Sequence, residues 1–480
     1  MMYKVVIGLE VHCELQTKSK NFSQAPNEFT EAHNINVGTV DLGLPGILPV
    51  ANKEAVRKAL FTSMALHCKL PDEIIFDRKN YYYADLPKGF QITQNTKPVG
   101  VGGYLDVLVN GKVKRVTLHD VHLEEDTASL EHYPKYSLID YNRSGVPLLE
   151  IVTDPCIESA DEAVAYLEDL RDVFLFLGVS EAKSNYGQMR CDVNISLMEE
   201  GAKELGTKVE MKNINAFNNV RAAIEYEIKR QTEVLSSGGK VVQETRRIAE
   251  DGKTYSMREK VDAVDYKYFI EPNIPSTPVT DELLDELKSN LPELKGDRYL
   301  KYIQEYGMTE YDAGVLSKTR NVSDYFEKVL KDGAELSLAI NFVTTSILST
   351  LNKLEIGIEE LFITPEMLSG VIKLVSENKL SMDAAKKLLY EAIEKKVDPV
   401  ELVKKEGLSQ INDEGQLLDL IKGIMDENLE VVRQYVEDGN MSAVNFFVGQ
   451  TMKKSNRQAN PNMSREIISQ ELERRKNNGK

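Results

Sequence analysis

Proline is distributed unevenly along this chain of 480 residues, and its distribution separates two kinds of structure. Thirteen of the sixteen prolines lie at or before Pro292, and only Pro365, Pro399 and Pro461 follow. Because proline lacks an amide hydrogen, it is rare inside helices and central strands and collects in loops and turns. We therefore predict a part rich in strands and loops up to about residue 293, followed by a helical part.

The helical part divides again near residue 405. One group of short helical patterns runs to about Lys404, and a second begins near Gly407. A chain of this length exceeds what one hydrophobic core supports, so two to four domains are expected. The two boundaries divide the chain into residues 1–293, 294–404 and 405–480. The expected fold class is α+β, with the strands first and the helices after them.

Composition and cysteine usage argue against several classes of protein. The sequence has no run of about 18 apolar residues, and MMYKVVIGLEVHCEL alternates like a strand rather than a signal peptide. The four cysteines, Cys13, Cys68, Cys156 and Cys191, are far apart and form no CxxC motif. A disulfide framework and a zinc ribbon are therefore unexpected, and we predict a cytoplasmic protein without a membrane span.

Acidic residues gather in one stretch, HDVHLEEDTASLEHYPKYSLIDYNRSGVPLLE, which runs from His119 to Glu150. Apolar residues are interleaved with the charged ones, and the stretch reads as strand, turn and strand. This pattern predicts carboxylates on a β scaffold whose other face is core. Converging carboxylates repel one another unless a cation lies among them, so the stretch is a candidate metal site.

The first strand supplies two more candidate ligands. Glu10 and His12 are two residues apart, which places them on one face of a strand. With Glu124, Glu125 and Glu150 they offer several oxygens and one imidazole, a set that suits magnesium or manganese better than zinc. The alternative is that these acids are solvated strand ends.

A further set of residues has the composition of a phosphate site. It comprises Asp140, Asn142, Arg143, Arg190, Asp192, Asn194, Lys208 and Lys212. Arginine and lysine neutralise phosphate oxygens, while aspartate and asparagine orient a metal ion or a ribose. The alternative is cross-strand salt bridging on an exposed face. Cys13 is next to His12 and so faces the opposite side of its strand, where we expect it in the core.

The C-terminal end is basic although the whole chain carries a net charge of −17. Between Met441 and Lys480 there are eight lysines and arginines, among them Lys453, Lys454 and Arg457, against three glutamates. A basic end on an acidic body is typical of a module that contacts nucleic-acid phosphates. The alternative is an ordinary charged helix end.

Taken together, the motifs resemble one family along almost the whole chain. They include VIGLEVHCEL, LGLPGILPV, FDRKNYYYADLPKGFQITQ, HLEED, SLIDYNRSGVPLLEIVTDP, MRCDVNIS, GTKVEMKNINAF, QETRR, DYKYFIEP and VGQTMKK. The sequence is similar to the B subunit of the bacterial tRNA-dependent aspartyl/glutamyl amidotransferases. The resemblance implies a cradle-like catalytic domain, an all-helical domain and a small YqeY-like tail domain that binds tRNA.

The resemblance also implies an activity and partners. The family works as a heterotrimer, in which the A subunit is a glutaminase and the C subunit is small. The B subunit uses ATP and magnesium to phosphorylate the side-chain carboxylate of Glu-tRNA(Gln) or Asp-tRNA(Asn). Ammonia channelled from the glutaminase displaces the phosphate and gives Gln-tRNA(Gln) or Asn-tRNA(Asn). The complex is thus a ligase that forms a carbon–nitrogen bond with glutamine as the nitrogen donor.

Residue by residue, the resemblance assigns metal binding to Glu10, His12, Glu125 and Glu150, with Glu124 beside them. It places a gate for ammonia at Lys79 and Glu125. Phosphate and nucleotide contacts are expected from Asn142, Arg143, Arg190, Asp192, Lys208 and Lys212, and tRNA contacts from Lys453, Lys454 and Arg457. In this interpretation the metal site is not expected to include three other residues of the acidic stretch, Asp120, His122 and Asp126.

The sequence departs from the family in one segment that bears on cofactors. Many members carry a cysteine cluster before LGLPG, where this chain reads FSQAPNEFTEAHNINVGTVDLG, so no structural zinc is expected. Two other hypotheses stay open: a stand-alone metal-dependent hydrolase or phosphotransferase, and a non-catalytic tRNA-binding scaffold. ATP turnover without tRNA or partners would favour the first of these.

Overall fold

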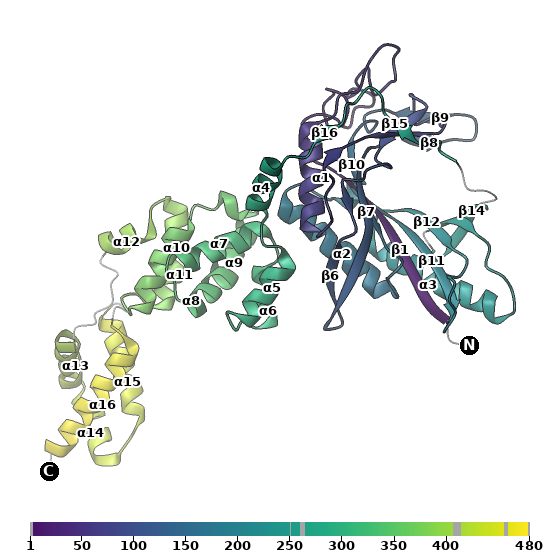
Figure 1. Cartoon of the computed structure of the whole chain (residues 1–480). Helices are drawn as coiled ribbons and strands as arrows, with labels where there is room; N and C mark the ends of the chain where they lie inside the picture. Colours follow the sequence, from purple (N-terminus) through teal and green to yellow (C-terminus); the bar gives the residue numbers. More distant parts are fainter. Residues whose placement is uncertain (1–2, 250, 260–264, 407–413, 456–458, 479–480) are drawn as a thin grey trace. The chain divides into compact units, whose positions relative to one another are not determined.

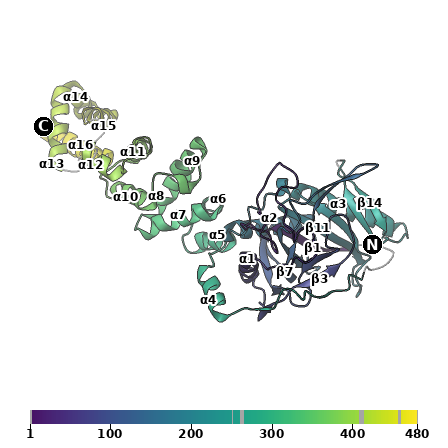
Figure 2. The same cartoon turned by 90° about the horizontal axis from the view of Figure 1, so that it is seen from above.

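The computed structural model describes residues 3–249, 251–259, 265–406, 414–455 and 459–478. The chain separates into two compact units, Met1–Gly296 and Asp297–Lys480. The first unit is rich in strands, and the second is built from helices (Figure 1 and Figure 2). This order confirms the predicted fold class.

One large sheet forms the first unit. Among the described residues its strands follow the order β14–β13–β12–β11–β1–β10–β7–β5, with β6 paired to β7. These strands are β1 (Tyr3–Glu14), β5 (Gly100–Val101), β6 (Tyr104–Val109), β7 (Lys112–Glu125), β10 (Pro147–Thr153), β11 (Met189–Glu199), β12 (Val209–Ile214), β13 (Glu244–Ile248) and β14 (Thr254–Glu259). Neighbouring strands are antiparallel except β12 and β13, which are parallel.

Three smaller sheets accompany the large one. They are β15 (Phe269–Ile270) with β3 (Asp77–Asn80) and β4 (Phe90–Thr93), β16 (Thr277–Pro278) with β2 (Glu73–Ile74), and β8 (Ser129–His132) with β9 (Ser137–Asp140). Local chemistry explains the main turn of the large sheet. Asn110 and Gly111 both have positive φ, as a tight two-residue hairpin turn requires, and they join β6 to β7.

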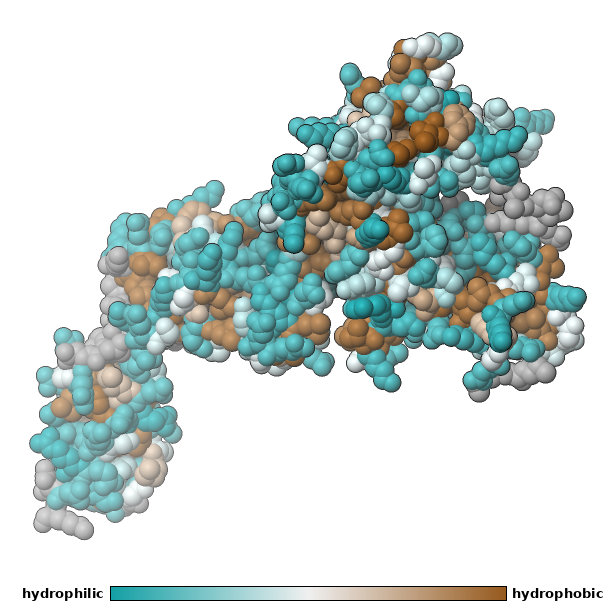
Figure 3. Space-filling model, in the orientation of Figure 1, coloured by the Kyte–Doolittle hydropathy of each residue, from teal (hydrophilic) through white to brown (hydrophobic). Residues whose placement is uncertain are grey.

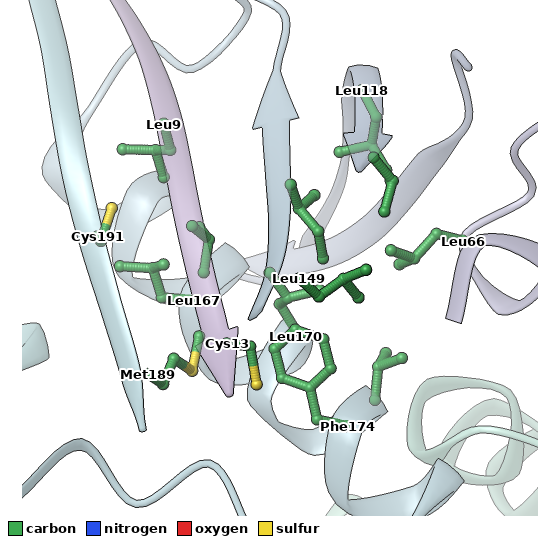
Figure 4. Close-up of a cluster of buried hydrophobic side chains, with 14 of the residues drawn as sticks. Leu9, Cys13, Leu66, Leu118, Leu149, Leu167, Leu170, Phe174, Met189 and Cys191 are labelled. Atoms are coloured by element: carbon green, nitrogen blue, oxygen red, sulfur yellow. The ribbon is translucent and has the colours of Figure 1, made fainter. Parts of the chain in front are cut away.

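One face of the large sheet packs into the hydrophobic core of this unit. Leu9, Val11 and Cys13 of β1 are fully buried, and they alternate with the polar residues that face the other way. Figure 4 shows Cys13 close to Leu170 and Phe174 of α2 (Ala160–Leu177), with Leu9 further along β1; all of them belong to one buried cluster with Leu167. The helices α1 (Lys53–Ala65) and α3 (Phe217–Ser236) contribute to the same core. The expectation that Cys13 belongs to the core is confirmed, and burial raises the pKa of its thiol to about 12.

Helix α2 begins and ends where its sequence signals predict. The Ser159 hydroxyl accepts the amide hydrogen of Glu162, and the Glu162 carboxylate accepts the amide hydrogen of Glu158. Gly178 ends the helix with a φ of 64°, a conformation that costs glycine little. These caps set where α2 begins and ends.

The second unit consists of short helices. They are α5 (Lys295–Gln304), which begins just before the unit boundary, α6 (Glu310–Leu316), α7 (Arg320–Lys331), α8 (Leu336–Asn341), α9 (Leu348–Leu354), α10 (Pro365–Ser376), α11 (Met382–Lys395), α12 (Pro399–Glu406), α13 (Glu414–Glu427), α14 (Leu429–Asp438), α15 (Ser442–Lys454) and α16 (Pro461–Asn478); α4 (Asp281–Asn290) precedes them. A π-helix, Phe342–Ile347, joins α8 to α9. Several of the helices begin at a threonine or serine whose hydroxyl caps the first turn: Thr309, Thr319, Thr364 and Ser381.

The helices bury two separate hydrophobic clusters. One lies between Tyr302 and Val403, and the other between Leu417 and Leu472. Hydrophobic residues on the visible surface are dispersed among hydrophilic ones (Figure 3). None of the helices in the described part of the chain is both long and apolar enough to cross a bilayer.

Candidate active site

The polar face of the large sheet collects charged residues from strands far apart in the sequence. On β1 this face carries Glu10, His12 and Glu14. The register places Glu150 of β10 on one side of His12 and Arg190 of β11 on the other. The core on the opposite face fixes this register, because a shift by one residue would turn every polar side chain into the core.

Three of these residues form the first cluster, His12, Glu124 and Glu150. One ligand atom from each lies within 4.8 Å of the others. His12 Nε2 is 3.4 Å from Glu150 Oε2, and the Thr93 hydroxyl donates to Glu124 Oε2 at 3.1 Å. His12 Nδ1 is buried and has no hydrogen-bond partner among the residues that the structure describes. Two carboxylates and an imidazole that converge in this way fit a hard divalent cation.

Burial and mutual charge set the electrostatics of this cluster. Burial alone raises the pKa of Glu150, but the neighbouring His122 and His12 outweigh it and hold that pKa well below its usual range. Burial and the charge of Glu150 raise the pKa of Glu124. Burial lowers the pKa of Lys79, but the charges of Glu124 and Glu150 raise it by more than burial lowers it. The pKa is therefore raised overall, and the lysine stays cationic beside the cluster.

His122 belongs to this neighbourhood although the sequence analysis set it aside. Its Nε2 lies 3.3 Å from Glu150 Oε2, and its Nδ1 lies 3.3 Å from Asp120 Oδ1. The strand register explains the contact with Glu150, because His122 of β7 is directly opposite Glu150 of the neighbouring strand β10. Glu150 therefore lies between two imidazoles.

A second cluster, Glu10, Asp192 and Glu210, lies on the same face of the sheet. One oxygen from each carboxylate lies within 4.8 Å of the others. Lys212 Nζ is 2.8 Å from Asp192 Oδ2 and 3.1 Å from Glu210 Oε1. Burial, followed by the charges of Glu150 and Asp192, raises the pKa of Glu10, so the two clusters influence each other. Glu210 is the one member of this cluster that the sequence analysis did not propose as a site residue.

Comparison with known proteins adds the family. The model of the GatB/GatE catalytic domain matches residues 5–285, and the model of the GatB domain matches residues 324–472. The B subunits of the aspartyl/glutamyl-tRNA(Asn/Gln) amidotransferases of Geobacillus thermodenitrificans and Shouchella clausii are each 44% identical to this chain over 477 residues, which is 99% of this chain and 100% of each relative. The chain belongs to the GatB family. The family resemblance inferred from the motifs is thereby confirmed.

In this GatB-family chain, Glu125 does not point toward the first cluster. It follows Glu124 on β7, and consecutive strand residues face opposite sides. Lys88 Nζ lies 2.5 Å from the Glu125 carboxylate, and the Ile92 amide donates to Glu125 Oε1 at 2.8 Å. Lys79, the lysine expected to pair with Glu125, instead has its Nζ 5.1 Å from the centre of the Tyr266 ring. The sequence offered no signal that selects Lys88.

The residues expected at phosphate groups have different surroundings. Arg190 donates two hydrogen bonds to Asp126, at 2.9 and 2.8 Å. Arg143 donates to the carbonyl oxygens of Thr127 and Ala128. Asn142 anchors the 32–36 loop of the chain, accepting two amide hydrogens there and donating to a carbonyl oxygen. Lys208 is exposed just before β12, while Lys212 and Asp192 belong to the second cluster.

A cavity of about 590 Å³ opens at the end of β1. Glu14, Arg143 and Tyr186 are among the residues that line it. Burial and the charge of Asp126 raise the pKa of Glu14 to about 7. Glu14 was not predicted as a site residue, although its position two residues after His12 was the signal that could have identified it.

Part of the charge expected to bind tRNA is paired within the tail. Lys454 Nζ lies 2.5 Å from Glu427, and Arg475 lies 2.8 Å from Asp426. Lys453 is exposed in the last turn of α15. Arg457 lies outside the described residues.

Proposed function

We propose that this chain is the B subunit of a tRNA-dependent amidotransferase, which converts Glu-tRNA(Gln) or Asp-tRNA(Asn) into Gln-tRNA(Gln) or Asn-tRNA(Asn). The carrying observation is the pair of carboxylate clusters on one face of the sheet, His12, Glu124 and Glu150 beside Glu10, Asp192 and Glu210. Relatives of the same length and 44% identity are named as this subunit. Such a reaction belongs in the cytoplasm, where the mischarged tRNA is made.

The chemistry requires an activated carboxyl group. A free carboxylate is a poor acyl donor, because its leaving group would be oxide. Transfer of the terminal phosphoryl group of ATP to the side-chain carboxylate gives an acyl phosphate and ADP, and attack by neutral ammonia then releases phosphate and forms the amide. A site that excludes water protects the acyl phosphate from hydrolysis, and the largely buried carboxylates on this face of the sheet fit that need.

The donor sets fit magnesium. His12, Glu124 and Glu150 would hold one ion, and Glu10, Asp192 and Glu210 a second. His122 at Glu150 and the Thr93 hydroxyl at Glu124 orient the first set. A bound magnesium ion supplies positive charge to the phosphate oxygens as the phosphoryl group moves. Lys212 lies beside the second set and would neutralise a phosphate oxygen there, with the exposed Lys208 close along the chain.

In this proposal, three of the residues expected at phosphate groups hold other parts of the chain in place. They are Arg190, Arg143 and Asn142. Arg190 holds Asp126, and Arg143 holds the backbone after it, so both keep the end of β7 in place. Asn142 holds the 32–36 loop. We therefore assign them positioning roles rather than direct contact with ATP.

The ammonia route is proposed to pass the end of β7. Glu125 and Lys88 form a buried ion pair there, and Lys79 lies near Glu124 and Glu150. The positive charge of Lys79 beside the acyl phosphate would repel the ammonium ion, whereas neutral ammonia could still pass. Lys79 and Glu125 thus keep their proposed roles at the gate, with Lys88 as the direct partner of Glu125.

The proposed partners are a glutaminase, as the A subunit, together with a small C subunit. The loop that carries Leu42, Leu44, Ile47, Leu48 and Val50 supports a protein partner, because all five side chains are exposed and apolar. The tail, residues 405–480, is proposed to contact tRNA through Lys453, Lys454 and Arg457. In this proposal the chain has three functional parts, residues 1–293, 294–404 and 405–480.

Reconstitution tests the proposal. With the A and C subunits, ATP, magnesium and glutamine, the complex should release ADP and form amide only when Glu-tRNA(Gln) or Asp-tRNA(Asn) is present. ATP turnover by the isolated chain without tRNA would support a stand-alone phosphotransferase instead. Amidation that persists in His12→Ala and Glu150→Gln complexes would support a scaffold role and contradict the metal assignment.

A further inference from the structure

The cavity at the end of β1 is lined by none of the residues of the two carboxylate clusters, but its Glu14 lies on the same strand as His12. Glu14 is two residues beyond His12 on the same face of β1, a separation of about 7 Å along a strand. The cavity of about 590 Å³ lies within the size range of sites for small ligands, roughly 300–1,000 Å³. A ligand held in the cavity on Glu14 would extend along this face of β1 toward His12, Glu124 and Glu150.

The carboxylate of Glu14 is free for a ligand. Within the described part of the chain, no side chain or amide donates a hydrogen bond to it. The two nearby guanidinium groups have other partners, since Arg190 is bonded to Asp126 and Arg143 to the carbonyl oxygens of Thr127 and Ala128. Glu14 feels the charges of Arg190 and Arg143 but accepts no hydrogen bond from either, so its oxygens keep their capacity to accept from a cationic ligand group.

The rim of the cavity has a different character. Phe29 and Tyr186 line it and are 75% and 57% exposed. Their ring centres are 5.4 Å apart with an interplanar angle of 60°, and Lys183 Nζ lies 6.0 Å from the centre of the Tyr186 ring. Exposed aromatic faces are the surfaces on which unpaired nucleobases stack. The cavity thus combines the Glu14 carboxyl group with two exposed aromatic rings.

We propose that this cavity holds the aminoacylated 3′-terminal nucleoside of tRNA, with the α-ammonium group of the amino acid on Glu14. The proposal rests on the proposed function and names how that substrate is held. An amino acid esterified to tRNA has a free α-ammonium group. In an aspartyl or glutamyl residue, this ammonium group and the carboxylate to be activated are separated by the length of the side chain. With the ammonium on Glu14, that carboxylate reaches the cluster at His12, Glu124 and Glu150.

The arrangement selects for an unblocked amino acid. An acetylated α-nitrogen carries no charge and adds bulk, so it would leave the Glu14 carboxylate unpaired. Removal of a charged hydrogen-bond partner of this kind should weaken the use of the substrate by about 10-fold or more.

The test compares Glu-tRNA(Gln) with N-acetyl-Glu-tRNA(Gln) in the reconstituted complex, with wild-type, Glu14→Gln and Glu199→Gln chains. Glu199 is exposed and pairs with Tyr3 at the other end of β1, so it is the matched control. Acetylation should raise the KM of the wild-type and Glu199→Gln complexes by about 10-fold or more. The Glu14→Gln complex should have a raised KM for the free substrate and respond little to acetylation.

Each other outcome counts against the proposal. Equal use of both substrates by the wild-type complex would overturn it without any variant. An equal acetylation effect in wild-type and Glu14→Gln complexes would place the α-ammonium group elsewhere. Failure of the wild-type complex to amidate unmodified Glu-tRNA(Gln) and Asp-tRNA(Asn) would reject the proposed function itself. A Glu14→Gln chain that does not fold still leaves the wild-type comparison decisive.

Discussion

At the scale of single residues, the two neighbouring acids Glu124 and Glu125 have different tasks. Glu124 lies with His12 and Glu150, whereas Glu125 is bonded to Lys88 and to the amide of Ile92. The alternation of a strand separates them, because β7 continues to Glu125. The same substitution at the two positions should therefore have different consequences.

We predict that Glu124→Gln lowers the affinity of the chain for Mn²⁺ by about 10-fold or more, because it removes a charged ligand. Glu125→Gln should leave Mn²⁺ affinity close to wild type and instead lower the free energy of unfolding by about 3 kcal/mol, since Lys88 loses its partner. Electron paramagnetic resonance of bound Mn²⁺ and chemical denaturation measure the two effects. Equal losses of Mn²⁺ affinity in both variants would contradict this division.

A second prediction concerns Glu227, which is buried in α3 and accepts hydrogen bonds from Arg230, Gln231 and Thr254. Burial by itself raises the pKa of Glu227, but these partners outweigh it, so the folded pKa lies below the ordinary value of 4.5. A depressed folded pKa contributes stability above pH 4.5 that disappears as the pH falls through the folded value. Glu227→Gln should thus destabilise the region at pH 7 by about 3 kcal/mol and by less near pH 3.

Hydrogen exchange of peptides from α3 and β13, corrected for intrinsic rates, measures this local stability. Glu233→Gln is the control, because Glu233 is exposed on the same helix. A difference between wild type and Glu227→Gln that stayed constant from pH 7 to pH 3 would show that the carboxylate charge does not stabilise the region.

At the scale of elements, the position of α2 depends on its caps and on its contact with the sheet. Ser159 accepts the Glu162 amide hydrogen, and Leu167 is fully buried against the strands. Ser159→Ala should lower the free energy of unfolding by about 1 kcal/mol. Leu167→Ala should lower it by about 2–5 kcal/mol, because it leaves a cavity between helix and sheet.

Urea denaturation of the full chain checks both values. Ser236→Ala is the control, since Ser236 is exposed in the last turn of α3 and alanine suits a helix. A Ser159→Ala chain as stable as Ser236→Ala would mean that the cap contributes nothing. If Leu167→Ala were equally neutral, α2 would not be part of the main core.

At the scale of the whole molecule, removal of residues 405–480 should weaken tRNA binding by about 10-fold or more without reducing ammonia production by the glutaminase partner. The reason is loss of basic side chains that displace counterions from phosphate, so the dependence of affinity on salt should also become shallower. Fluorescence anisotropy of labelled tRNA at several salt concentrations measures both quantities. Unchanged affinity and salt dependence after truncation would assign tRNA binding to the rest of the chain.

Sequence patterns alone determined much of this protein. The excess of proline before residue 293 separated the β-rich part from the helical part, and the alternation in β1 placed Glu10 and His12 opposite Cys13. Ser159 and Gly178 located both ends of α2. These features depend on residues within a few positions of one another, so local preferences and period are sufficient to predict them.

Only the tertiary structure decided which charged groups meet. It placed Glu150 between His12 and His122, brought Glu210 to Glu10 and Asp192, and paired Glu125 with Lys88 rather than Lys79. These contacts join segments that are far apart in the sequence, and the register of the strands among them follows from which face of each strand is buried in the shared core. Local sequence carries no record of that register, because it is a property of all the strands together.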